Sequence, residues 1–314
     1  MTSRQTTLAL ALVATLSSPS AFALLGGSAD VNTADSHWAG VGAITINGNV
    51  FSGVMLDSTH MLTAAHVVAG QVNTAGNVSV SFNVGGDLTE TLSASSISVY
   101  GGFTGTAPGP DGVWHDDLAV ITLSTSITSV VPYYGLYGGS MQDKTITMVG
   151  YGGTGTGSTG VTGNASASLK TSGQNVVETT LVDDDGGTSR EVFVFDFDGP
   201  TSATNVYGNP NPGNLTLGTT VEAQYAGGDS GSPVFVQVNG QWQLAGIGTF
   251  NGKTTLSNES NVLFGSIGGG TIVASYIPWI NEQMAASVPE PQAWAMLLVG
   301  MGLVGAAVRL KART

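Results

Sequence analysis

The sequence predicts an all-β protein, and two observations lead to this fold class. Glycine makes up 46 of the 314 residues while only 9% of the residues are charged, a composition typical of strand-rich proteins with many turns. From Ala39 to Leu123, short β-prone segments alternate with turns, at a spacing that favours a small barrel. Long helices are not expected, and the length suits one or two domains.

The first half is predicted to hold five strands, and two candidate functional residues border them. Asp117 stands directly before the last strand, and His66 ends the segment Met61–His66, which follows the second one. Both side chains are therefore expected at strand ends. The strands are Val41–Ile46, Val50–Leu56, Val78–Val84, Ile97–Tyr100 and Leu118–Leu123.

The second half, from about Tyr133, is predicted to hold further strands and a closing helix. A hairpin is expected around Asn239-Gly240, a dipeptide typical of two-residue β-turns. The helix covers Ser275–Met284, with Pro278 in the first turn, where proline is tolerated. The expected strands are Thr145–Val149, Val176–Val182, Glu191–Phe197, Val234–Val238 and Trp242–Thr249.

The tract from Gly152 to Lys170 is rich in glycine, serine and threonine and is predicted to be a flexible loop. Its letters from Gly155 to Gly160 match a dinucleotide-binding fingerprint. No strand–helix context accompanies them, so nucleotide binding is not expected.

Two acidic turns raise the question of calcium, one at 183–185 and the other at Asp196 and Asp198. Calcium binds several oxygen ligands gathered in one place. The spacing matches no standard calcium loop, so solvated acidic turns are favoured over a calcium site.

The stretch Gly227-Gly228-Asp229-Ser230-Gly231-Ser232-Pro233-Val234 presents one serine among glycines. Glycines bring the backbone close to a ligand, so the N–H groups of Gly228 and Ser230 can point together at a developing oxyanion. A serine nucleophile needs a base that a third group orients. His66 and Asp117 supply these groups, and the intervals along the chain are 51 and 113 residues. Each residue alone is more often structural; the three signatures together indicate catalysis.

In this order and with these neighbours, His66, Asp117 and Ser230 resemble the chymotrypsin/trypsin-like serine protease family, from about Leu24 to Met284. The resemblance implies a protease domain of residues 24–286, built from two antiparallel six-stranded β-barrels, about 24–132 and 133–286, and a short C-terminal helix. It implies that Ser230 attacks the scissile carbonyl, His66 transfers the proton and Asp117 orients the imidazole. Gly228 and Ser230 form the oxyanion hole. No metal or organic cofactor is needed.

The resemblance also assigns the substrate cleft. Gln224 takes the position where trypsin-like members carry an aspartate, so we expect uncharged residues before the scissile bond, because an unpaired buried charge is costly. Thr249 is expected to offer its hydroxyl to Asp117. Phe250 and Asn251 are expected to line the cleft, and Asn251 narrows its entrance toward small or medium side chains.

Several other positions carry structural expectations. His115 is expected to be an ordinary surface residue, and Trp279 to pack against the second barrel. The chain has no cysteine. Phe51 and Val67 stand where extracellular family members usually carry a disulfide, as an apolar pair in its place.

The first 23 residues fit a secretory signal, with Arg4, an apolar run from Leu8 to Leu16 and small residues before a cleavage site after Ala23. A buried N-terminal helix is the alternative. Signal peptidase is the implied partner, and the next residues are Leu24-Leu25-Gly26-Gly27.

This new N-terminus resembles the Ile-Val-Gly-Gly start of trypsin-like enzymes. The resemblance implies that the Leu24 α-amino group inserts beside Asp229 as an activation pair. The alternative is that these residues are only the apolar end of the signal.

Residues 287–314 resemble a PEP-CTERM sorting signal of Gram-negative bacteria. Val288-Pro289-Glu290-Pro291 precedes a 16-residue apolar run, Ala293–Val308, and then a basic tail. The run is short for a bilayer span, and the basic tail favours a cytoplasmic end. An exosortase-like enzyme and transient membrane contact are implied, and a permanent anchor is the alternative. The mature protein is expected in the periplasm, on the cell surface or secreted.

Charge excludes one class of partner. Of the 8 basic and 21 acidic residues of the whole chain, 4 and 20 lie between Leu24 and Val288, a net charge of −16. Nucleic acid is therefore not an expected partner. The sequence predicts an exported serine endopeptidase acting on proteins or peptides. The alternative is a surface or matrix adhesion module on a protease scaffold.

Overall fold

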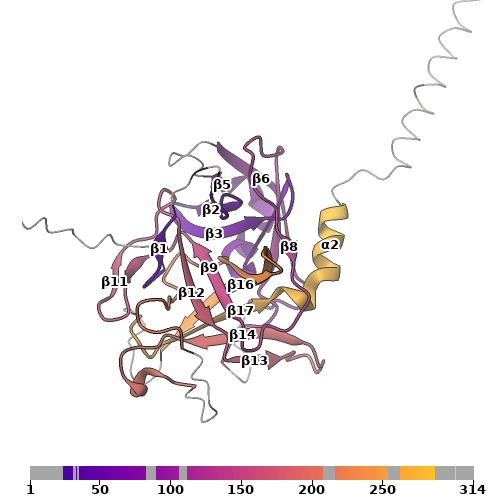
Figure 1. The fold of residues 1–314 in the computed structure, drawn as a ribbon. Coiled ribbons are helices and arrows are strands. Elements are labelled where there is room, and N and C mark those ends of the chain that lie inside the picture. Colours follow the sequence, from indigo (N-terminus) through magenta and orange to yellow (C-terminus); the bar gives the residue numbers. More distant parts are fainter. Residues whose placement is uncertain are drawn as a thin grey trace, which may run out of the picture.

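The computed structural model describes residues 24–30, 33, 35–82, 90–105, 112–207, 216–253, 262–286 and 301. Figure 1 shows two strand-rich halves with a short helix packed at one side. The predicted all-β class and the short C-terminal helix are confirmed. The predicted signal segment and all of 287–314 except Met301 lie outside the described residues.

The first half is a closed six-stranded barrel, as predicted. Buried apolar side chains from every strand fill it, and Val67 belongs to this core while Phe51 packs against it. In order around the barrel, the strands are β2 (Val41–Ile46), β3 (Asn49–Met55), β4 (His60–Thr63), β7 (Ala119–Leu123), β6 (Glu90–Val99) and β5 (Val78–Phe82).

The second half is a nine-stranded sheet, which differs in detail from the expected ring of six strands. Six strands form its centre: β12 (Thr171–Val176), β9 (Thr145–Gly150), β15 (Pro233–Val238), β16 (Gln241–Gly252), β17 (Ile267–Ile272) and β14 (Arg190–Asp196). Three short strands extend it: β1 (Ser28–Ala29) on β12, β13 (Thr179–Val182) on β14, and β8 (Gly135–Leu136) on β16.

The two ends of the central six strands meet through a side chain instead of a strand ladder. The Asn175 amide nitrogen in β12 donates to the carbonyl of Asp196 in β14 at 2.8 Å and to that of Ala223 at 3.1 Å. One buried asparagine therefore joins the edges that a closed barrel would join by backbone pairing.

The tract predicted to be a flexible loop between Gly152 and Lys170 contains a hairpin instead. Strands β10 (Thr154–Thr156) and β11 (Gly160–Gly163) pair in it. The turn residues that favoured a loop are used at the tight reversal between the two strands.

The helices are short, and the last one packs where the two halves meet. Trp279 in α2 (Ile277–Ala286) meets the ring of Tyr100 edge-on at 5.3 Å and packs against a core cluster that contains residues of both halves. The others are α1 (Ala65–Val68), η1 (Ala69–Asn77), η3 (Ser202–Thr204) and η4 (Val273–Tyr276).

The segment after the predicted signal cleavage is held in the second half. Leu24 and Leu25 are both fully buried, and Leu25 exchanges two backbone hydrogen bonds with Gln224 at 2.9 and 3.0 Å. Within the described part of the chain, no helix is both long and apolar enough to cross a membrane.

Candidate active site

His66 and Asp117 form a tight pair at the edge of the first barrel. His66 lies in α1, one turn after β4, and Asp117 lies just before β7, which pairs with β4. The imidazole Nδ1 is 2.6 Å from Asp117 Oδ2, and the His66 backbone N–H donates to Oδ1 at 2.8 Å. The carboxylate is fully buried, so both of its oxygens hold the histidine in one orientation.

The loop that carries Asp117 is anchored from the second half. Thr271 in β17 donates its hydroxyl to the Asp117 carbonyl at 3.3 Å, and Tyr276 donates to the carboxylate of the preceding Asp116 at 2.8 Å. The expected hydrogen bond from the Thr249 hydroxyl to Asp117 is not formed. Thr249 Oγ1 is buried and has no hydrogen-bond partner among the described residues. Thr249 is the extra residue where the β16–β17 register shifts, and such a bulge changes side-chain direction.

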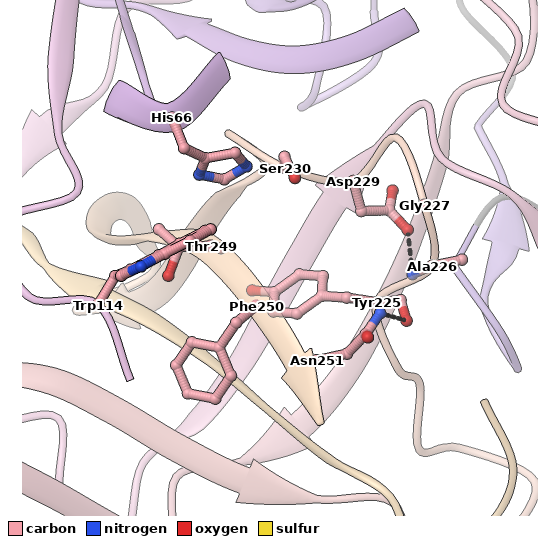
Figure 2. Close-up of a pocket in the computed structure, with 11 residues that line it drawn as sticks. His66, Trp114, Tyr225, Ala226, Gly227, Asp229, Ser230, Thr249, Phe250 and Asn251 are labelled. Carbon is pink, nitrogen blue, oxygen red and sulfur yellow. Dashed lines mark hydrogen bonds between the residues drawn. The ribbon is translucent and has the colours of Figure 1, made fainter. Parts of the chain in front are cut away.

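Ser230 projects from a loop of the second half, and Figure 2 shows it beside the His66 ring. Gly228 and Gly231 flank it with φ of 98° and 83°, a region that favours glycine. Neither the Gly228 nor the Ser230 backbone N–H donates to another described residue. Two adjacent amide donors are therefore available at the nucleophile position.

Ser52 in β3 ties this loop to the first barrel. Its backbone N–H donates to the Ser230 carbonyl at 3.0 Å, and its hydroxyl donates to the Gly228 carbonyl at 3.3 Å. The same hydroxyl accepts the backbone N–H of Tyr151 at 3.0 Å. One serine of the first half thus holds the Gly228 and Ser230 carbonyls, while the N–H groups of the same two residues have no acceptor among the described residues.

Asp229 is buried beneath the loop without a cationic partner among the described residues. Its two oxygens accept the backbone N–H groups of Gly152 and Ala226, both at 2.9 Å. The backbone of Leu24 is a third hydrogen-bonding partner. Burial raises the pKa of this carboxyl from 3.8 to about 7, against the lowering effect of the three N–H groups.

A cleft of about 380 Å³ opens beside His66 and Ser230. Phe250 and Asn251 line it as expected. Trp114 also lines it, with its ring 5.5 Å from the His66 ring. Sequence reasoning missed Trp114; its position three residues before Asp117 was the only signal. The cleft is lined by His66, Trp114, Tyr225, Ala226, Gly227, Asp229, Ser230, Gly248, Thr249, Phe250 and Asn251.

Gln224 does not line the cleft, which corrects its assignment. Its amide is turned inward, where the nitrogen donates to Ser266 Oγ at 3.2 Å and the oxygen accepts the Tyr225 N–H at 2.8 Å. The buried Tyr225 side chain lines the cleft in its place, and Asn251 donates to the Tyr225 carbonyl at 2.9 Å. Tyr225 and Asn251 therefore define the wall that Gln224 was expected to form.

His115 is buried, not an ordinary surface residue. Its Nδ1 lies 3.4 Å from Glu191 and 3.6 Å from Asp184. Burial, with the nearby Asp116 and Asp183 charges, raises the pKa of Glu191 to about 7, while His115 lowers it. Among described residues these three could hold a metal ion. The attraction between a histidine and two carboxylates explains why these three side chains lie together even without a metal ion.

The acidic turns divide into two kinds. Asp184 and Asp185 are exposed, as expected for a solvated turn. Asp196 and Asp198 are only 2% and 4% exposed, which corrects the expectation of solvation. They follow β14 into the interior, whereas the 183–185 turn joins two strands at the surface.

Fold and site together define a serine protease. Residues 26–280 match the trypsin family, and residues 287–313 match the PEP-CTERM protein-sorting motif. Because the first match covers most of the chain, this protein belongs to the trypsin family. Among solved structures, a glutamyl endopeptidase in complex with MPD is similar in fold, with 18% identity and a TM-score of 0.54, over 84% of this chain and 99% of that one.

Proposed function

We propose that this protein is an exported endopeptidase in which Ser230, His66 and Asp117 act as one catalytic unit. The observation that carries the proposal is the buried 2.6 Å contact of His66 Nδ1 with Asp117, together with the place of Ser230 beside the His66 ring (Figure 2). With Nδ1 held by a carboxylate, Nε2 is the nitrogen that faces the serine.

The proposed chemistry follows from this arrangement. Ser230 Oγ attacks the scissile carbonyl while His66 Nε2 takes its proton, and Asp117 stabilises the imidazolium that forms. His66 then returns the proton to the leaving amine, which yields an acyl-enzyme, and water hydrolyses the ester by the same route. No hydrogen bond joins Ser230 and His66 among the described residues. Catalytic hydrogen bonds are often long before substrate binds and tighten in the complex.

The free backbone N–H groups of Gly228 and Ser230 would bind the oxyanion of the tetrahedral intermediate. Each such donor is worth about 3–4 kcal/mol where donors have been removed. The Ser52 contacts support this role, because they hold the loop carbonyls away from the space that the oxyanion would occupy.

The cleft supports a preference for small or medium uncharged side chains before the scissile bond. No lysine or arginine is among the residues that line it, and the Tyr225 ring and Asn251 occupy its wall. A substrate lysine or arginine would find no carboxylate here except Asp229, whose oxygens already accept backbone N–H groups.

Export and processing follow from the two ends of the chain. The sorting motif at 287–313 supports removal of the C-terminal segment by an exosortase-like enzyme after transient membrane contact. Cleavage by signal peptidase after Ala23 would give a free Leu24 amine beside Asp229.

A fluorophosphonate probe tests the proposal. Stoichiometric labelling of folded protein at Ser230 is expected, and absence of labelling would support a non-catalytic adhesion module. His66→Ala, Asp117→Asn and Ser230→Ala should each lower kcat/KM about 10⁴-fold or more, and losses in a double variant should not add. His37→Ala, an exposed histidine, is the matched control and should retain activity. Additive losses would contradict the single catalytic unit.

A further inference from the structure

One imidazole and two carboxylates, those of His115, Asp184 and Glu191, meet outside the lining of the cleft. His115 Nδ1 lies 3.4 Å from Glu191 Oε2 and 3.6 Å from Asp184 Oδ1, and one ligand atom of each residue lies within 4.8 Å of the other two. His115 and Glu191 are buried, whereas Asp184 lies at the surface. The group is therefore mostly shielded and has one side open to solvent.

The separations in this group are longer than those of the other histidine–carboxylate pairs of the described chain. His66 Nδ1 lies 2.6 Å from Asp117, and His60 Nδ1 lies 2.7 Å from Asp57. A charge-assisted N–H···O bond is about 2.7–2.9 Å long, whereas His115 Nδ1 stays 3.4 and 3.6 Å from its two carboxylates. Attraction explains why the three side chains lie together, but it does not explain this gap between them.

The gap matches the spacing of ligands around one metal ion. Nitrogen and oxygen ligands lie roughly 2.0–2.2 Å from a tetrahedral zinc ion, which places the ligand atoms roughly 3.3–3.6 Å from one another. Both separations of His115 Nδ1 fall in this range. The three side chains are therefore spaced as ligands of an ion and not as partners in direct hydrogen bonds.

Glu191 gives a second, independent indication of a bound cation. Its side chain is 9% exposed, and among the described residues its carboxylate has His115 as its only hydrogen-bond partner, at 3.4 Å. The negative charges of Asp116 and Asp183 also act on it, and no lysine or arginine of the described ranges forms a salt bridge with it. A buried carboxylate in such surroundings is costly unless a cation or a proton neutralises it.

We propose that His115, Asp184 and Glu191 bind one zinc ion, with water in the remaining position. Zinc accepts imidazole and carboxylate ligands together in tetrahedral sites. Calcium and magnesium are bound by oxygen ligands, so a histidine in the set disfavours both. The Asp184 side chain is 36% exposed, which leaves a path for the ion from solvent into the folded protein.

The ion would join the two halves beside the catalytic aspartate. His115 precedes Asp117 by two residues in the segment before β7 of the first barrel, whereas Asp184 lies between β13 and β14 and Glu191 lies in β14. Zinc bound to all three would hold the Asp117 segment against the second half and stabilise the docked arrangement. Its role is structural, and the hydrolytic chemistry does not pass through it.

Isothermal titration with Zn²⁺ tests the proposal on the purified protein carrying Ser230→Ala, with any affinity tag removed and bound metal stripped by EDTA. One Zn²⁺ per chain is expected, with much weaker Ca²⁺ and Mg²⁺ binding. Glu191→Gln and Asp184→Asn should each weaken Zn²⁺ binding about tenfold or more. Asp185→Asn, in the same exposed turn, is the matched control. His66→Ala excludes binding at the catalytic imidazole, and both controls should leave the Kd unchanged.

Cobalt in place of zinc reports the geometry of the site. Four-coordinate Co²⁺ absorbs visible light far more strongly than the octahedral aquo ion, so binding should produce intense bands that Zn²⁺ displaces. His115→Gln should abolish these bands, while circular dichroism checks that the variant keeps its strand content. Saturating Zn²⁺ should also raise the Tm of the Ser230→Ala protein. The same addition should leave the Tm unchanged once Glu191→Gln is introduced.

The outcomes separate this site from the proposed protease activity, because none of these measurements uses catalysis. Absence of saturable Zn²⁺ binding to the Ser230→Ala protein would overturn the proposal and leave a proton as the neutralising species. Equal Zn²⁺ affinity with and without Glu191→Gln and Asp184→Asn would place the ion elsewhere and overturn it too. Asp184 lies at the surface, so its variant should fold and gives an answer even if a buried variant does not.

Discussion

One extra alanine before Leu24 tests whether a free N-terminus completes the active site. Leu24 is fully buried, and its backbone hydrogen-bonds to Asp229. In the uncleaved chain the group at this position is an amide. After cleavage following Ala23 it would be an ammonium, which supplies the positive charge that Asp229 lacks. The extension would move that charge by one residue, away from a carboxylate that directly precedes Ser230.

The size of the expected loss in kcat/KM follows from the burial of Asp229. Its pKa rises from 3.8 to about 7, which corresponds to about 4 kcal/mol of unfavourable charge burial. Removing one partner of a buried ion pair costs about 3–5 kcal/mol in measured cases. If the oxyanion loop is shaped by this pair, the alanine extension should lower kcat/KM by about 10²- to 10³-fold.

The assay compares two purified forms whose N-termini are verified by mass spectrometry, one starting at Leu24 and one at the added alanine. Leu24→Ile with a free N-terminus is the control and should stay within a few-fold of the parent. The amine has an unperturbed pKa near 8, which pairing with Asp229 should raise. The ammonium's contribution is therefore full below about pH 8 and lost as pH rises through the raised pKa. Equal kcat/KM and superimposable alkaline pH profiles in the two forms would refute the mechanism.

Three further outcomes are expected. Gly228→Ala should lower kcat at least 10²-fold, because its new Cβ would lie 2.5 Å from the Ala165 Cβ at a φ of 98°. Gly135→Ala, away from the cleft and with no atom within 4 Å of its new Cβ, should be nearly silent, and similar kinetics in both would count against the oxyanion role. Asn251→Gly should widen the cleft, and cleavage-site profiling should show larger residues before the scissile bond. An unchanged profile would rule out Asn251 as the residue that limits side-chain size. A preference of the parent enzyme for Arg or Lys would contradict an uncharged pocket. A chain ending at Val288 should be soluble and active, and failure to fold would show that the C-terminal segment belongs to the structure.

Local patterns predicted the strands that have clear apolar faces, but not those whose identity depends on their neighbours. β17 was missed because Gly268, Gly269 and Gly270 carry no β-prone side chain. In the structure a Cβ on Gly270 would lie 1.9 Å from the Ile247 carbonyl oxygen, and one on Gly269 would lie 2.3 Å from that of Phe193. The absence of side chains lets β17 fit between β16 and β14, which no periodicity along the chain reveals.

The site divides in the same way. Local signatures singled out His66, Asp117 and Ser230, and in the structure His66 contacts Asp117 and has Ser230 beside it; their catalytic roles stay a prediction. The direction of Thr249 depends on a one-residue register shift against β17, and the inward turn of Gln224 depends on Ser266. Both are contacts between segments distant in sequence. Side-chain direction at such positions is decided by pairing and burial, which a single sequence does not encode locally.

The three hydrogen bonds that Ser52 makes to the second half make the reactive geometry a property of the boundary between the halves. Ser52 belongs to β3 of the barrel, whereas the carbonyls of Gly228 and Ser230 and the N–H of Tyr151 belong to the other half. Separation of the halves would release this loop without breaking the strand pairing within either half. Mild denaturant or pressure should thus inactivate the enzyme before spectroscopy detects unfolding of either half. Resistance to inactivation would then report how strongly the two halves dock, and not how stable their cores are.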